Sequence, residues 1–335
     1  MTTPEPSLTT SHGRTVRASS RGVGRRRGTT GATTEPTTGP TTGPTTGPSE
    51  LIVSGPRPAR MVFVTAAWGS CFLFIQWGLR DAPVVWFAAA RALLAGAVLV
   101  TVALVQHRPQ PTGSRAWTWL GAIALVNVTL AFAAMFAGVA GLSTGAAAVL
   151  ANAQPLLILL PAWWLYGERL SARTAAALTV GFGGLILVAA PGGGGSGALL
   201  SLLAAAAVTA GTLLSRRLTG MDLVSAAGWH LLIGGGALVV LAVATEGAPS
   251  IAWTPRLVVS IAFLGVVGTA APTVVWFTEA RRSRFDTLTS WTFLTPVVGI
   301  ALAVSVLGER PSGWTALGLT ATLVAMRVAV RPPRR

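Results

Sequence analysis

The chain has 335 residues, of which 52% are hydrophobic and 10% are charged, and its mean hydropathy is +0.63. Soluble domains carry about 25% charged residues, so this composition excludes an ordinary soluble protein and predicts a polytopic helical membrane protein. The net charge of +15 does not indicate a nucleic-acid partner, because every basic residue is arginine and the arginines lie in the N-terminal segment and in alternate predicted loops.

The N-terminal segment, residues 1–58, is predicted to be a disordered, basic, cytoplasmic tail. It contains a Thr/Gly/Pro repeat at 33–48 and an arginine cluster from Arg14 to Arg27, and such a composition buries too little apolar surface to fold. The cluster either attracts anionic lipid headgroups or only helps to hold the N-terminus inside. We expect no cleavable signal peptide, because no apolar region precedes residue 61.

Ten apolar runs follow the tail, each close to the roughly 20 residues that cross a bilayer core. The predicted spans are 61–79, 84–106, 117–138, 145–166, 171–190, 197–215, 224–243, 257–278, 287–307 and 312–330. Short connections such as 80–83 force consecutive spans into antiparallel hairpins. The expected fold is therefore an all-α integral membrane protein.

The arginines indicate how these spans are oriented. The tail and alternate loops hold 21 of the 25 arginines, whereas the opposite loops hold only Arg80, Arg256 and Arg310. Because arginine accumulates in cytoplasmic loops, we expect both termini in the cytoplasm and a multi-pass protein of the inner or plasma membrane.

An internal repeat appears when the sequence is shifted by 141 residues. Pro155 then falls on Pro296, and the Gly-Glu-Arg triplet at 167–169 falls on the one at 308–310. The two prolines are predicted to break or bend helices, and the two glutamates, Glu168 and Glu309, to form structural corners at helix ends.

A second alignment extends the repeat to the preceding spans. At a shift of 139 residues, Arg91 falls on His230. The chain is thus predicted to contain two five-span domains, 59–192 and 193–335. Because five is odd, the second domain enters the membrane upside down, and inverted repeats around a midplane site are the architecture of secondary transporters.

These motifs carry a family resemblance over residues 61–330. They are WGSCFLFIQWGL (68–79), the Pro83 to Arg91 spacing, and the blocks 154–188 and 295–319. The sequence resembles the EamA-type members of the drug/metabolite transporter superfamily. The resemblance implies ten helices, cytoplasmic termini, a central cavity between the halves, and movement of small metabolites, amino acids or drugs, often as exporters. This chain has Gln76 where many relatives carry lysine.

Arg91 is the sharpest candidate for solute binding, because a charge at membrane depth costs at least about 2.5 kcal/mol on insertion scales. Its guanidinium either binds an anionic group such as a substrate carboxylate, closes an outer gate, or snorkels outward as a structural residue. The other candidates are either cavity-lining or structural, as hydrogen-bonding or interface residues. They are Trp68, Gln76, Asn152, Gln154, His230, Trp276 and Trp291.

The pattern predicts a secondary transporter of small organic solutes, with export favoured, that works by alternating access. No catalytic, metal-binding or cofactor-binding set is predicted: no acid lies in the middle of a span, and the single cysteine, Cys71, excludes an internal disulfide and a cysteine-based metal site. The expected partners are the solute and the bilayer, in a monomer or a homodimer. The rival class is a membrane-embedded enzyme or lipid-handling protein.

Overall fold

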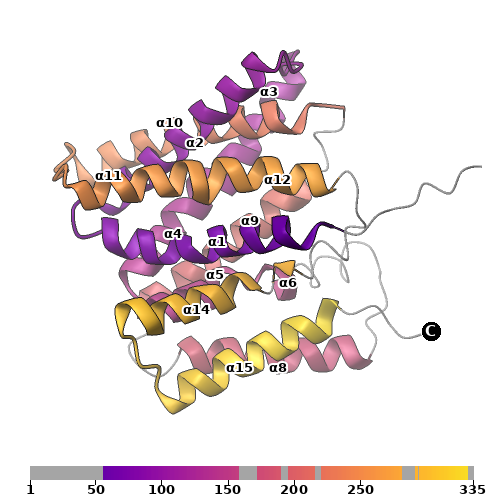
Figure 1. The fold of residues 1–335 in the computed structure, drawn as a ribbon, viewed down its shortest axis with the longest axis vertical. Helices are drawn as coiled ribbons and strands as arrows, with labels where there is room; N and C mark the ends of the chain where they lie inside the picture. The colour runs from indigo at the N-terminus through magenta and orange to yellow at the C-terminus, as the bar shows by residue number, and fades with distance from the viewer. Residues whose placement is uncertain are drawn as a thin grey trace, which may run out of the picture. The chain divides into compact units, whose positions relative to one another are not determined.

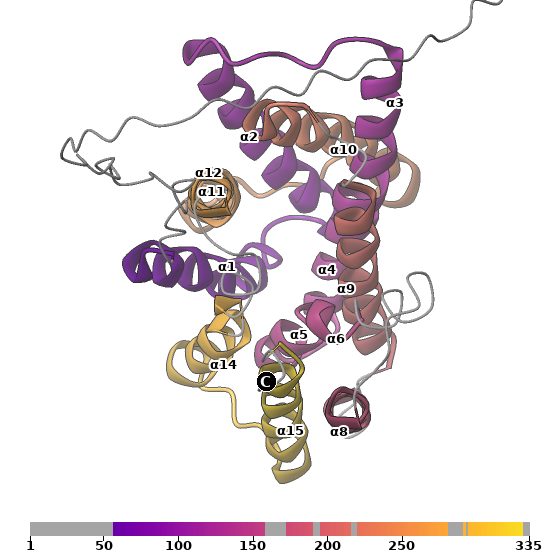
Figure 2. The same ribbon diagram turned by 90° about the vertical axis from the view of Figure 1, so that its right-hand side faces the viewer.

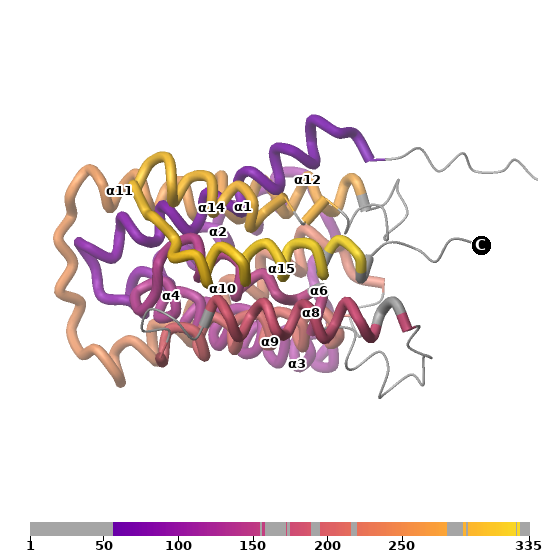
Figure 3. The backbone as a smooth tube through the Cα atoms, turned by 90° about the horizontal axis from the view of Figure 1, so that it is seen from below, coloured from indigo at the N-terminus to yellow at the C-terminus, as the bar shows by residue number. Residues whose placement is uncertain are grey.

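The computed structural model describes residues 56–157, 172–189, 195–215, 220–280, 291–292 and 294–330, and all of its regular elements in these ranges are helices. The predicted tail up to residue 55 and the corner residue Glu168 lie outside the described residues. Figures 1 and 3 show these helices gathered in one bundle.

The helices of the first half agree with the predicted first, second, third and fifth spans to within a few residues, whereas the predicted fourth span is described only up to residue 157. They are α1 (Pro58–Gly78), α2 (Val84–Val105), α3 (Ser114–Ile123), η1 (Ala124–Leu130), α4 (Ala131–Ala140), α5 (Thr144–Ala151), α6 (Gln154–Leu157) and α8 (Ala172–Ala189). α3, η1 and α4 are one continuous helix in which η1 is π-helical.

The helices of the second half repeat this order. They are α9 (Gly195–Ser215), α10 (Leu223–Glu246), α11 (Pro255–Ala262), η2 (Phe263–Ala270), α12 (Ala271–Ala280), α14 (Leu294–Leu307) and α15 (Gly313–Val330). α11, η2 and α12 again form one continuous helix with a π-helical middle.

Six of the described helices are long and apolar enough to cross a membrane, and three further apolar helices are shorter. Large apolar side chains also face outward: Val105, Leu199 and Val240 are each at least 70% exposed. Apolar surface of this kind is expected where lipid, rather than water, surrounds a protein. The structure is therefore that of a multi-pass helical membrane protein.

The predicted fourth span is broken, and the break precedes its proline. α5 ends at Ala151, and α6 begins again at Gln154, so that Pro155 lies in the first turn of α6. A proline fits there because the first amides of a helix have no intrahelical acceptor. Pro296 likewise lies in the first turn of α14 and is buried. Neither proline interrupts the described part of a helix, so both mark helix starts and not mid-helix kinks.

The two halves interleave instead of packing as separate bodies. The closest helix pairs are α2 with α10, α8 with α15, α4 with α9, and α1 with α14, each joining one half to the other. Figures 1 and 2 show α8 next to α15 at one edge of the bundle.

Glycines allow the helices of two of these pairs, α8–α15 and α2–α10, to approach each other closely. A Cβ on Gly184 of α8 would lie 2.8 Å from the carbonyl oxygen of Gly318 of α15, and one on Gly235 of α10 would lie 2.9 Å from Leu93 of α2. Small residues let helix backbones approach closely in this way. Gly183 and Gly236, which adjoin them in the sequence, meet nothing within 4 Å, so they do not serve this packing.

Candidate solute-binding site

Arg91 is buried in the middle part of α2, with its side chain held between the halves. The residue is only 5% exposed. Its Nε donates to the hydroxyl of Thr269 in η2 at 3.1 Å, and its Nη2 lies 3.6 Å from Sγ of Cys71 in α1. Its Nη1 is buried and has no hydrogen-bond partner in the described structure. The outward-snorkelling alternative therefore does not describe this conformation.

Two aromatic rings cover the guanidinium. The Arg91 Cζ atom lies 4.6 Å from the ring centroid of Phe132 and 5.9 Å from that of Phe136, both on α4. Cation–π attraction of this kind stabilises a desolvated cation by about 2 kcal/mol. It does not neutralise the charge, and none of the ion pairs formed among the described residues includes Arg91.

The π-helical segments explain why Thr269 can reach Arg91. The wider turn lets the Thr269 hydroxyl donate to the carbonyl of Leu264, five residues earlier, at 2.8 Å while it accepts from Arg91. Thr129 in η1 occupies the matching place in the first half and donates to the carbonyls of Ala124 and Gly234. π-helical turns often occur at functional sites. Each π-helical segment packs on the second helix of the other half.

Two of the candidate tryptophans meet one another near this cluster. The rings of Trp68 in α1 and Trp276 in α12 have centroids 5.4 Å apart. Trp68 lies about one helical turn before Cys71, and Trp276 about two turns after Thr269, so the pair continues the same inter-half seam. Trp291 is half-buried and lies just before α14.

The polar candidates at the helix break form hydrogen bonds within the protein. The Asn152 amide donates to the carbonyl of Ala148 at 2.7 Å, and the Gln154 amide donates to the hydroxyl of Thr212 in α9 at 3.0 Å. The first contact satisfies a backbone carbonyl one turn before the break, and the second joins the start of α6 to α9. Gln76 differs, because its Oε1 is buried without a partner in the described residues.

His230 does not join Arg91, although the two residues align in the repeat. α2 and α10 pack antiparallel, since Gly228 faces Val100 and Gly235 faces Leu93. The two residues therefore lie at depths that differ by roughly 10 Å, or about seven residues at 1.5 Å each. The His230 ring nitrogen Nδ1 lies 3.1 Å from the carbonyl oxygen of Ala226, which is a local structural contact.

The five described acids all connect one half of the chain to the other at helix ends. Arg256 donates to both carboxylate oxygens of Asp81, at 2.6 and 2.8 Å, and Arg108 donates to Asp222 at 3.0 Å. Asp81 and Asp222 are themselves 141 positions apart, the offset of the repeat. The acids of the two ion pairs thus occupy matching positions of the repeat, whereas their partners Arg108 and Arg256 are 148 positions apart.

The three glutamates hold the first turns of helices in the first half. Glu246 accepts from the amides of Val85 and Trp86 in α2, and Glu309 accepts from Thr144 and Gly145 in α5. Glu279 accepts from the Arg57 amide and the Arg60 guanidinium at the start of α1. A carboxylate at a helix N-terminus is stabilised by the free amides and the helix dipole. Glu309 therefore contacts a helix of the other half, and its role as a structural corner of its own half stays a prediction.

The ion pairs lower the pKa values of the two aspartates, which lie outside the spans. Hydrogen bonds from Arg256 are the main reason that the pKa of Asp81 lies below its ordinary value, with Thr254 adding to them against burial. For Asp222, burial raises the pKa, but donation from the Ser225 amide and from Arg108 outweighs it, so that its pKa is also lowered.

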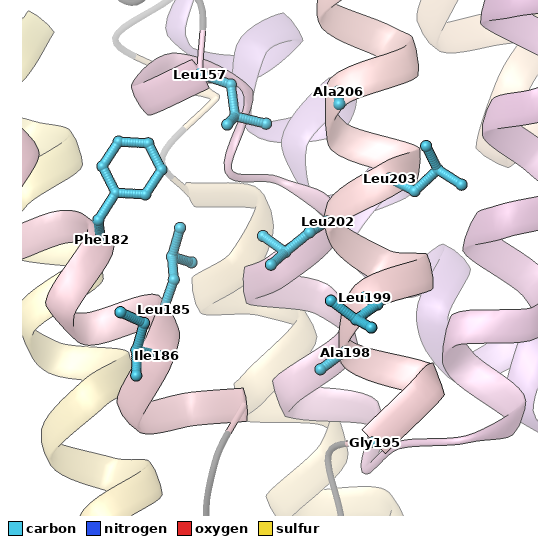
Figure 4. A pocket seen from close by; sticks show the side chains of 10 residues that line it. All are labelled: Leu157, Phe182, Leu185, Ile186, Gly195, Ala198, Leu199, Leu202, Leu203 and Ala206. Atoms are coloured by element: carbon cyan, nitrogen blue, oxygen red, sulfur yellow. The ribbon is translucent and has the colours of Figure 1, made fainter.

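Two cavities lie away from Arg91. One of about 630 Å³ opens between α8 and α9 and is lined by apolar side chains such as Phe182, Leu185 and Leu202 (Figure 4). The other, of about 330 Å³, lies beside Glu309 and includes Ser143 and Ser312. Arg91 lines neither of these two cavities, and because it is only 5% exposed, its side chain is closed off from the surface in this conformation.

The order of the helices and the repeated halves agree with a known protein family. Residues 60–190 and 195–331 each match the EamA-like transporter family. The chain belongs to the EamA-like transporter family. This confirms the resemblance carried by the sequence motifs and supports membrane transport in general.

Several relatives of this EamA-like transporter span most of the chain. An uncharacterized transporter of Synechocystis sp. is 29% identical, covering 77% of this chain and 85% of that protein. A chloroplastic WAT1-related protein of Arabidopsis thaliana is 30% identical, covering 77% of this chain and 66% of that protein. Protein PecM of Dickeya dadantii is 26% identical, covering 77% and 86%. One crystal structure shares the fold, with a TM-score of 0.58 and 20% identity over 81% of this chain and 95% of that one.

Four residues of the site in this EamA-like chain were not among the sequence candidates. They are Cys71, Phe132, Phe136 and Thr269. Thr269 could have been chosen as a candidate from the sequence, because it is the only hydrogen-bonding side chain between residues 261 and 272. The phenylalanines carried none, since their spacing of four is also that of an ordinary packed helix face.

Proposed function

We propose that this protein is a secondary transporter that moves small organic solutes across the plasma or inner membrane by alternating access, with export as the favoured direction. In this proposal the chain has ten spans in two inverted five-helix halves, with both termini in the cytoplasm. Family membership and the transporter names of its relatives support transport in general. The rival proposal of an enzyme or lipid-handling protein has no comparable support.

One observation carries the proposed binding site. Arg91 is a buried cation with an unpaired Nη1 and no acidic partner among the described residues. An ion in a low-dielectric interior is costly unless it is paired. A transported anionic group would supply the missing partner. When that group leaves the site, the charge of Arg91 is again unpaired and can bind the next solute. We therefore assign Arg91 to solute binding, with Trp68 and Trp276 as walls and Gln76 as a further polar contact.

The closed state of the site fits an intermediate of alternating access. Asp81 with Arg256 and Asp222 with Arg108 join the halves at opposite ends of the antiparallel α2 and α10 pair. Opening a path to Arg91 from either side requires that one set of end contacts loosens while the other holds. Inverted repeats are suited to this exchange because the same contacts occur on both faces.

The test is transport by the purified full chain in proteoliposomes, with a panel of small organic anions, amino acids and cationic drugs. Arg91→Ala should reduce transport of the accepted solute by at least about tenfold, the effect of losing a charge-assisted hydrogen bond. Arg91→Lys should also be impaired, since an ammonium cannot reproduce the guanidinium geometry.

Arg80→Ala is the matched control, because Arg80 is an exposed loop arginine near the start of the same helix. It should transport like the unaltered chain. Normal transport by both Arg91 variants, with correct folding, would rule out a binding role for Arg91.

A further inference from the structure

We propose that the solute bound at Arg91 is a monovalent organic anion, namely one carboxylate on an apolar or aromatic body, and not a zwitterion or a multivalent anion. This inference rests on the proposed transport function and narrows its substrate class. It follows from how many charges on the solute, and of which sign, the site can neutralise. It also follows from the side chains that surround the site.

The first step is the charge of the site. Arg91 is the only charged residue that lies more than about one turn from both ends of its helix in the described structure. Arg60, Arg115 and Arg256 lie in first turns, and Glu246 and Glu279 lie at the last turns. One bound negative charge therefore neutralises the described interior. A second negative charge would stay unpaired at a depth where an unpaired ion costs several kcal/mol.

The second step is the set of donors that remain available. Nε and one Nη2 hydrogen of Arg91 are directed to Thr269 and Cys71. Both hydrogens of Nη1 are unused in the described structure, and Nη2 keeps its second hydrogen. Parallel donation from two guanidinium nitrogens is the geometry that matches one carboxylate.

The third step concerns a positive charge on the solute. An α-amino acid brings an ammonium group close to its carboxylate, so the site would need an acid near Arg91. The described acids lie at helix ends, where Asp81, Glu246 and Glu309 are each engaged across the two halves. Arg91 itself repels the ammonium group. The described site thus opposes a zwitterion, although its aromatic rings attract cations weakly.

The fourth step is the rest of the solute. Phe132 and Phe136 lie against the guanidinium, and the Trp68–Trp276 pair lies farther along the same seam. These surfaces bury an apolar or aromatic body favourably and offer few hydrogen bonds to a sugar-like one. The class that satisfies all four steps is a monocarboxylate with an apolar remainder.

The chain contains its own reporter for this site. Cys71 is the only cysteine, and its sulfur is 3.6 Å from Arg91. The experiment measures the rate of Cys71 alkylation by N-ethylmaleimide in the full chain in nanodiscs, and in parallel the thermal unfolding midpoint. The probes are four compounds with the same phenyl group: 3-phenylpropionate, phenylalanine, benzylmalonate and phenethylamine.

The expected result is that 3-phenylpropionate slows alkylation at least about fivefold and raises the unfolding midpoint, whereas the other probes change the rate by less than about twofold. Arg91→Gln should abolish both effects, and Arg80→Gln should keep them. Equal protection by phenylalanine, benzylmalonate or phenethylamine, or no effect of 3-phenylpropionate on either readout, would overturn the proposed class.

Flux measurements separate this inference from the proposed function. Monoanion-specific protection of Cys71 without flux of any probe in proteoliposomes would leave the binding class intact and contradict transport. Flux of phenylalanine or benzylmalonate without flux of 3-phenylpropionate would support transport and contradict the class.

Discussion

At the scale of single residues, the site depends on how one buried charge is held. Arg91 has three kinds of neighbour: a hydroxyl, a thiol and two aromatic rings. None of these groups carries a negative charge at neutral pH. The guanidinium is thus oriented without being neutralised, which leaves it available to an anion from outside the protein.

Thr269 is expected to orient Arg91, and its hydroxyl can be removed without changing the side-chain shape. Thr269→Val leaves the Arg91 Nε without its acceptor, so we expect a loss of roughly 1–3 kcal/mol in unfolding free energy. Thr269→Ser should recover most of it. The measurement is unfolding of the purified protein in detergent.

Thr273→Val provides the comparison, because the Thr273 hydroxyl only donates to the Thr269 carbonyl one turn back. Thr273→Val should lower the unfolding free energy by less than about 0.5 kcal/mol. Equal costs for Thr269→Val and Thr273→Val would show that the Arg91 contact contributes nothing.

At the scale of elements, the helices of the two halves are joined by close contacts at glycines and by carboxylates that bind groups at helix ends in the other half. The α8–α15 pair depends on the first kind. Gly184→Ala should cost about 1–3 kcal/mol, because its new methyl would overlap the backbone of Gly318. Gly183→Ala, one residue earlier, meets open space and should be neutral or slightly stabilising. Unfolding midpoints of the two variants compare them directly, and the same midpoint for both would contradict this packing.

The Asp81–Arg256 pair should make stability depend on acid pH. Because hydrogen bonds from Arg256 lower the pKa of Asp81 in the folded chain, the unfolded chain binds more protons. The contribution of this pair is therefore complete above the ordinary aspartate pKa, about 3.9, and is lost as the pH falls through the lowered value.

Asp81→Asn should accordingly lower the unfolding midpoint at neutral pH. Below about pH 4, the midpoint of this variant should fall less than that of the unaltered chain. Arg256→Gln should have the same two effects, since it removes the other half of the pair. Parallel midpoint curves for Asp81→Asn and the unaltered chain across this range would contradict the assignment.

At the scale of the whole molecule, the proposed orientation in the membrane rests on the positions of the arginines and on the repeat. With the N-terminus inside, five spans place the link between the halves outside. A reporter fused at Gly193 should therefore be detected outside, and one fused after Arg217 inside. Reversed signals at these two positions would exclude the proposed topology.

The fold class, the approximate helix positions and the internal repeat could all be predicted from the amino-acid pattern. Each predicted span coincides wholly or partly with a described helix, because runs of about 20 apolar residues can satisfy their backbone in lipid only as helices. Arg91 could also be singled out from sequence, because charge is costly at that depth wherever its neighbours lie.

The neighbours of Arg91 and the contacts of the acids could be learned only from the folded chain. Thr269 and Cys71 are 178 and 20 residues from Arg91, and the π-helical turn that presents Thr269 has no periodic signal in the sequence. The structure also separated His230 from Arg91, since repeat-related residues on antiparallel helices lie at different depths. Local pattern fixes which segments are helical, whereas contacts between the interleaved halves depend on packing that no single segment encodes.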